Sequence, residues 1–109
     1  MQGVIDQLLK ENQTCVLRER RSVQRQPFAR PVFIRHGRDH LEVQQAFSKD
    51  LSRAGIGIVS DTNWTVGRIA ELEIHRLQNR PVRFKAEVRW CEPYGPGWYL
   101  TGWHFLQVV

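Results

Sequence analysis

The stretch Val82-Arg83-Phe84-Lys85-Ala86-Glu87-Val88-Arg89-Trp90 decides the fold class. Apolar and charged residues alternate through its nine positions, which is the period of a β-strand with one buried and one solvated face. The pattern predicts a strand over residues 82–90, with Trp90 on the inward, apolar face.

Shorter segments with a similar texture lie on both sides of this strand. Glycine and proline separate them at Gly37-Arg38-Asp39 and at residues 93–97, where turns are predicted. The other predicted strands are Pro31–His36, Leu41–Phe47, Gly55–Val59, Arg68–His75 and Trp98–Val108. Six short strands in antiparallel order predict a mainly all-β fold, a six-stranded antiparallel β-barrel, because closure of the sheet hides its edges.

The same alternation predicts side-chain directions. In the segment 68–75, Leu72 and Ile74 are expected to face inward and Glu73 outward. For Trp98 and Trp103 we favour core packing, and the alternative is a place at the barrel mouth or on a partner surface.

The 109 residues suit one domain. Its predicted parts are an N-terminal helix (1–16), a basic linker (17–27) and the barrel (28–109). The i, i+4 spacing of Val4 with Leu8 and of Ile5 with Leu9 predicts a short helix over residues 4–12. A helix this short needs a surface to pack on, and we favour its own barrel over a second subunit.

Residues 17–26 are strongly polar and basic. We interpret them as an exposed linker; a helical extension with i, i+4 charge pairs is the alternative. A segment that buries little apolar surface is expected to be poorly ordered until a ligand binds it.

The composition indicates a basic cytoplasmic protein. The formal net charge is +5, and arginine dominates the basic residues, which favours bidentate and stacking recognition. Cys15 and Cys91 lie far apart without metal-ligand spacing, so free thiols in a reducing compartment are expected. The sequence shows neither a secretion signal nor an apolar run of about 20 residues, the length that spans a bilayer.

Two short clusters indicate a ligand site. Arg20-Arg21-Ser22-Val23-Gln24-Arg25 supplies three guanidinium groups, and Asp50-Leu51-Ser52-Arg53-Ala54-Gly55 supplies a carboxylate, a hydroxyl and a glycine. Guanidinium groups bind phosphate oxygens and the O6/N7 edge of guanine in a bidentate manner, and they stack on purines. Together the clusters predict a pocket for a small, anionic, guanine-containing ligand.

The pattern Arg21-x-x-x-Arg25 followed by Asp50-x-Ser52-x-x-Gly55 resembles the two-part signature of PilZ domains, bacterial receptors for cyclic di-GMP. The resemblance covers residues 20–108. It implies a six-stranded barrel and a cyclic di-GMP receptor without catalytic activity. Because no output domain is evident, it also implies an unidentified downstream partner protein.

The resemblance also implies a role for each motif residue. Arg21 and Arg25 would clasp guanine and phosphate, and Asp50 would accept hydrogen bonds from guanine or orient one of these arginines. Ser52 would bond to a phosphate or base edge, and its alternative role is to cap its own turn. A side chain at Gly55 would block the ligand or the turn.

A cationic residue immediately before the first motif, here Arg20, resembles family members that bind an intercalated ligand dimer, so two ligands per domain are expected. Ligand binding would pin the linker across the barrel mouth and reposition the N-terminal helix, which would expose or hide a partner surface.

Other functions are weaker candidates. The histidines lack paired metal-ligand spacing, and no nucleophile elbow supports catalysis, so we expect neither a metal site nor an enzyme. The alternatives are a small basic barrel that binds single-stranded nucleic acid and a ligand-free adaptor of the same fold. Alternating charges on the wet strand faces count against the first, and the intact motifs count against the second.

Overall fold

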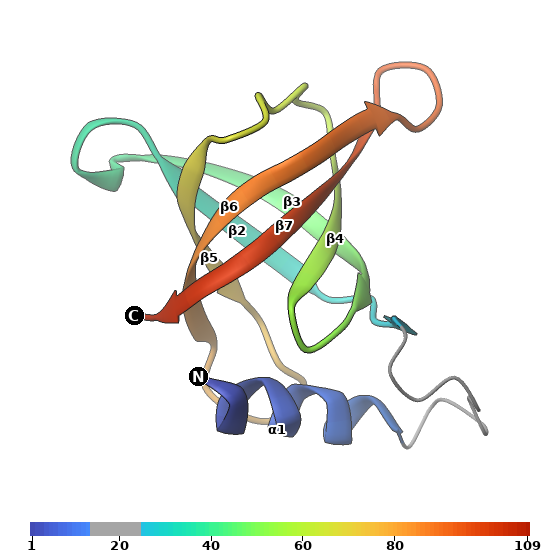
Figure 1. Cartoon of the computed structure of the whole chain (residues 1–109), viewed down its shortest axis with the longest axis vertical. Coiled ribbons are helices and arrows are strands. Elements are labelled where there is room, and N and C mark those ends of the chain that lie inside the picture. The colour runs from blue at the N-terminus through green and yellow to red at the C-terminus, as the bar shows by residue number, and fades with distance from the viewer. Residues whose placement is uncertain (14–24) are drawn as a thin grey trace.

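The computed structural model describes residues 1–13 and 25–109 of the chain (Figure 1). Arg20, Arg21 and most of the predicted basic linker therefore lie outside the described residues. The described elements are α1 (Gln2–Gln13), β1 (Gln26–Pro27), β2 (Pro31–His36), the 3-10 turn η1 (Arg38–His40), β3 (Glu42–Leu51), β4 (Gly55–Ser60), β5 (Ile69–Ile74), β6 (Val82–Pro93) and β7 (Tyr99–Val108).

The strands form a closed antiparallel barrel. They follow the order β1-β3-β2-β5-β6-β7-β4, and β3 also pairs with β4. This last pairing joins the two ends of the sheet, so β2 to β7 close on themselves (Figure 1). The predicted fold class is thereby confirmed. The two residues of β1 lie at the end of the predicted linker (17–27), and they pair with Asp50 and Leu51 at the end of β3.

Two strands run further than the sequence pattern indicates. β3 continues through Leu51, because Asp50 and Leu51 pair with Gly57 and Ile56 of β4. Asp50 therefore lies within a paired strand and does not follow its end. β6 continues to Pro93 through its pairing with β7.

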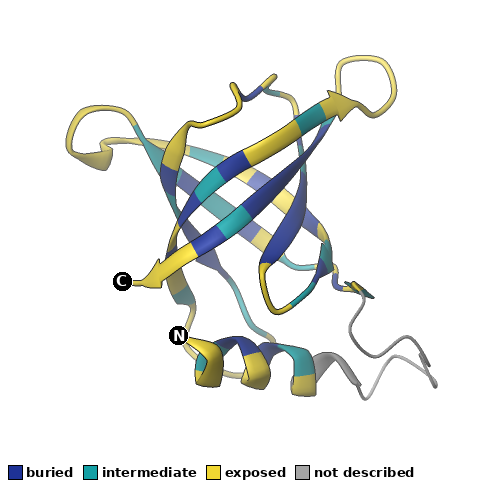
Figure 2. Ribbon diagram, viewed as in Figure 1, coloured by how far each residue is buried: buried dark blue, intermediate teal, exposed yellow. Residues whose placement is uncertain are grey.

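Buried apolar residues of the strands and of α1 form one core cluster inside the barrel, and Figure 2 marks the buried positions along these elements. Ile5 and Leu8 are fully buried and belong to the same core cluster as the strand residues. Burial of each such side chain is worth roughly 2 kcal/mol. α1 lies across one end of the barrel (Figure 1), so the helix packs on its own barrel, as favoured from the sequence.

The tryptophans divide between interior and surface. Trp103 is 1% exposed and meets the buried Trp64 edge to face, with ring centroids 5.4 Å apart, which confirms the core interpretation for Trp103. The same interpretation is wrong for Trp98, which is 48% exposed. Trp98 lies in the turn between β6 and β7, where the turn backbone holds it away from the core.

Glu73 of β5 belongs to the outer face but is nearly buried, at 8% exposed. Arg35 Nη2, His75 Nε2 and Arg83 Nη2 lie 3.0, 2.8 and 3.2 Å from its carboxylate oxygens. Burial alone would raise the pKa of Glu73. Hydrogen bonds from His75 and Arg35 and the charges of Arg35 and Arg83 outweigh it, so the pKa lies below its ordinary value.

Cys91 on β6 is a free thiol whose Sγ lies 3.3 Å from Asn63 Oδ1, and burial raises its pKa. Within residues 1–13 and 25–109, no helix has the length and apolar character to cross a bilayer. In the same part of the chain, no three His, Cys, Asp or Glu side chains gather in a way that could hold a metal ion.

Candidate ligand-binding site

Four residues lie side by side across four strands on the outer surface of the barrel. Asp50 of β3 pairs with Gly57 of β4, Gly57 pairs with Gly102 of β7, and Gly102 pairs with Trp90 of β6. We call Asp50, Gly57, Gly102 and Trp90 the glycine row. The neighbours of Gly57 on β4 are fully buried isoleucines, so alternation along the strand directs Gly57 outward.

The two central glycines leave room for the two flanking side chains. A Cβ atom at Gly102 would overlap the indole ring of Trp90, and one at Gly57 would lie 2.5 Å from Asp50 Oδ1. The Gly57 N–H instead donates a hydrogen bond of 3.1 Å to that carboxylate oxygen. Asp50 and Trp90 therefore cover the two glycines, which are buried beneath them, and the row presents these two flanking side chains at the surface.

A β-bulge next to each end of the row decides which way these side chains face. The β3–β4 register shifts between Ser48 and Asp50, and the β6–β7 register shifts between Val88 and Trp90. Each bulge adds one residue to its strand and so changes the alternation beyond it. The predicted inward position of Trp90 is wrong for this reason, and its side chain is 38% exposed on the surface.

Arg25 contacts the carboxylate end of the row. Its Nη1 donates a 2.8 Å hydrogen bond to Asp50 Oδ1. Arg25 immediately precedes β1, whose pairing with the end of β3 holds the backbone beside Asp50. The structure thus shows the two motifs in contact through this ion pair.

Ser52 and Gly55 shape the turn from β3 into β4. Ser52 Oγ accepts hydrogen bonds of 3.3 Å from the N–H groups of Ala54 and Gly55, so it caps its own turn. A Cβ atom at Gly55 would overlap the backbone carbonyl oxygen of Trp103 on β7. In this structure the glycine therefore serves the close approach of β4 to β7.

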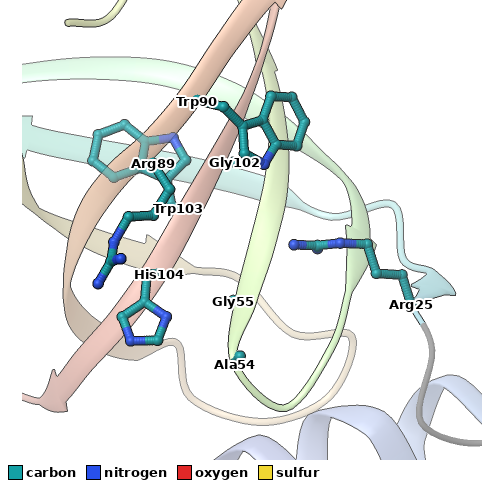
Figure 3. A pocket seen from close by; sticks show the side chains of 8 residues that line it. All are labelled: Arg25, Ala54, Gly55, Arg89, Trp90, Gly102, Trp103 and His104. Atoms are coloured by element: carbon teal, nitrogen blue, oxygen red, sulfur yellow. The ribbon is translucent and has the colours of Figure 1, made fainter. Parts of the chain in front are cut away.

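A cavity of about 80 Å³ lies beside the glycine row. Arg25 borders it on one side, and Arg89 and His104 border it on the other, with Gly55, Gly102 and the indole of Trp90 between them (Figure 3). Of the predicted residues, Arg25 and Gly55 line this cavity. Asp50 holds Arg25, and Ser52 stands one turn away.

Sequence reasoning missed Arg89, Trp90, Gly102 and His104. Strand alternation, taken without the bulge, directs Trp90 into the core. Gly102 and His104 lie on β7, far along the chain from both motifs, and only the strand register brings them to the cavity. An unexplained glycine inside a predicted strand was the available signal, since such a residue often marks a close approach.

A second, larger hollow of about 340 Å³ lies between the start of α1 and the barrel. Ala54 and His104 line both cavities. Arg53 connects α1 to the motif turn, because its carbonyl oxygen accepts a 3.3 Å hydrogen bond from Gln2 and its Nε lies 3.6 Å from Asp6 Oδ1.

The domain is thus a closed barrel with an arginine–carboxylate pair, an exposed tryptophan and a small cavity on its surface. The family model for the PilZ domain matches residues 19–108, and the chain therefore belongs to the PilZ domain family. PilZ domains are known as non-catalytic receptors that bind cyclic di-GMP. No curated protein matches this chain.

Proposed function

We propose that this protein is a cytoplasmic, non-catalytic receptor that binds cyclic di-GMP beside the glycine row and signals to a partner protein. The observation that carries the proposal is the Arg25–Asp50 pair at the edge of a cavity that Trp90 also borders. Membership of the PilZ family supports the choice of ligand.

The surfaces around the cavity match the parts of the ligand. The indole of Trp90 offers a flat apolar face for a guanine base. Arg25 offers a guanidinium group to phosphate oxygens or to guanine O6 and N7. Asp50 keeps Arg25 in place and presents a second carboxylate oxygen to the N1–H and N2–H donors of guanine.

The proposal also includes Arg20 and Arg21, which precede Arg25 in the chain and lie outside the described residues. Arg21 would bind the ligand together with Arg25. Arg20 would favour an intercalated ligand dimer, with two ligands for each domain. Because the 80 Å³ cavity holds only part of such a ligand, the remainder would lie over the glycine row, within reach of residues that precede Arg25.

The proposed switch depends on two connections between α1 and the site. Along the chain, residues 14–24 connect α1 to Arg25. Across space, Arg53 of the motif turn contacts Gln2 and Asp6 of α1. A ligand that binds Arg25 and the motif turn would act on both connections and would shift the position of α1, which presents the changed surface to a partner.

Isothermal titration calorimetry tests the proposed function. The wild type should bind cyclic di-GMP saturably, and Arg21→Ala and Arg25→Ala should each weaken binding about 10- to 100-fold, the usual cost of a lost charged hydrogen bond. Arg38→Ala is the matched control, because this exposed arginine lies in η1, away from the site (Figure 1).

A single-stranded oligonucleotide titrated in parallel distinguishes the alternatives. Saturable oligonucleotide binding without a response to cyclic di-GMP would instead identify a nucleic-acid-binding barrel. If neither ligand produced heat, the chain would be a ligand-free adaptor of this fold.

A further inference from the structure

The cavity beside the glycine row has a cationic side that neither sequence motif contains. Arg89 of β6 and His104 of β7 border it on the side opposite Arg25 (Figure 3). Cross-strand pairing places His104 opposite both Gly55 of β4 and Glu87 of β6, so its position on the outer face is fixed by two neighbouring strands.

The bulge in β6 gives Arg89 its place at the cavity. Val88 pairs with Trp103 and Trp90 pairs with Gly102, which leaves Arg89 as the extra residue. A regular strand would direct consecutive side chains to opposite faces. Here Arg89 and Trp90 both border the same cavity, so the bulge brings a guanidinium group and an indole to one site.

Arg89 has a carboxylate neighbour, Glu87, but its side chain remains largely accessible to solvent. Arg89 Nε lies 3.5 Å from Glu87 Oε1, and the Arg89 side chain is 55% exposed. This contact is longer than a good charged hydrogen bond, which measures about 2.7–2.9 Å. In Figure 3 the side chain of Arg89 extends to the side of the cavity on which His104 lies, away from Arg25.

We propose that Arg89 and His104 form a second anion subsite, which takes the second phosphate of a cyclic dinucleotide. The inference rests on the proposed function, because it assigns one phosphate to the Arg25 side and one to the Arg89 side. A base on Trp90 lies between them. With cations on both sides, the site selects a ligand with two phosphates over a mononucleotide with one.

The test compares cyclic di-GMP with GMP on the full chain. Binding of cyclic di-GMP is measured by calorimetry, and GMP by its displacement of labelled cyclic di-GMP. In the wild type the cyclic dinucleotide should bind far more tightly. Arg89→Gln should weaken cyclic di-GMP about 10- to 100-fold and change GMP affinity less than about twofold, so that selectivity falls. His104→Gln should act in the same direction, with a smaller effect.

Three further variants separate recognition from structure. Arg38→Gln carries the same charge change away from the site and should leave selectivity unchanged. Arg89→Lys should give an intermediate affinity, because an ammonium group lacks the bidentate geometry. Glu87→Gln, which frees Arg89 from its carboxylate neighbour, should leave cyclic di-GMP affinity unchanged or strengthen it.

Two outcomes are kept apart by this design. If the wild type binds cyclic di-GMP and Arg89→Gln retains full selectivity with a normal thermal unfolding curve, the second subsite is refuted while the proposed function stands. If the wild type binds no cyclic di-GMP, the proposed function itself fails.

Discussion

Two rows of residues lie on opposite sides of the barrel, and each consists of four residues paired across four neighbouring strands. The rows differ in the side chains at their centres. The glycine row spans β3, β4, β7 and β6. A second row, here called the filled row, crosses β3, β2, β5 and β6 through paired positions; it consists of Gln45, Phe33, Glu73 and Arg83.

The centre of the filled row carries a phenylalanine and a carboxylate. Arg35, His75 and Arg83 enclose Glu73 until it is only 8% exposed. The centre of the glycine row carries two glycines, and the adjacent cavity remains open. The Glu73 side chain is only 11% exposed, whereas those of Arg25 and Asp50 are 39% and 21% exposed. The difference indicates that the enclosed charge of the filled row stabilises the fold, whereas the more exposed pair beside the glycine row remains accessible to a ligand.

The largest expected effect comes from adding a side chain at the most crowded point of the cavity floor. Gly55→Ala places a methyl group against the backbone oxygen of Trp103, and a backbone atom cannot move aside without disturbing the β4–β7 pairing. We expect a loss of about 3 kcal/mol of unfolding free energy, measured by urea denaturation.

Gly3→Ala in α1 is the control for this substitution, because a Cβ atom there meets no atom within 4 Å. It should be neutral or stabilise the helix by up to about 1 kcal/mol. Equal stability of Gly55→Ala and the wild type would show that the backbone of β4 at Gly55 does not lie this close to Trp103 of β7.

A medium effect, on cyclic di-GMP affinity, is expected when the indole of Trp90 is removed. Trp90→Ala should lower cyclic di-GMP affinity about tenfold through the loss of base stacking. Calorimetry on Trp98→Ala supplies the comparison, since Trp98 is similarly exposed but lies in the β6–β7 turn. The same loss in both variants would remove Trp90 from the site.

The smallest effect is expected in the filled row. Ionised Glu73 contributes stability that is complete above the unfolded carboxyl pKa near 4.5 and is lost as the pH falls through the lowered folded-state pKa. Glu73→Gln should therefore cost about 1 kcal/mol at pH 7 and flatten the loss of stability below pH 4.5.

Urea unfolding across a pH series measures this dependence. Glu92→Gln, at an exposed carboxylate on β6, should leave the curve unchanged. Cyclic di-GMP affinity at pH 7 should be the same in Glu73→Gln and the wild type. A weakened affinity would mean that the two rows are coupled and do not have separate roles.

Alternation and turn residues were sufficient to predict the barrel. Residues 82–90 indicated a strand by their pattern alone, and the i, i+4 spacing of Ile5 with Leu9 and of Val4 with Leu8 indicated the helix that packs on the barrel. The motifs predicted Arg25 and Asp50 as parts of one site, and the structure brings these two side chains into contact.

The rest of the site depends on β-bulges and on the register between strands, which the alternation of apolar and polar residues does not indicate. A bulge leaves the local composition unchanged, so no residue pattern around Trp90 indicates that its side chain faces outward. The burial of Glu73 likewise depends on Arg35 and Arg83, which reach it from two other strands. Register between strands, more than the identity of any residue, determines both results.

Each bulge consists of one extra residue in a strand, so the set of side chains on the outer surface depends on the number of residues in that strand. Deleting Lys49 or Arg89 would restore regular alternation, and Asp50 or Trp90 would then follow the inward-facing Ser48 or Val88 directly and stay on the outer face. A single added codon can thus place one more side chain on the outer face of such a barrel while every residue of the core stays the same.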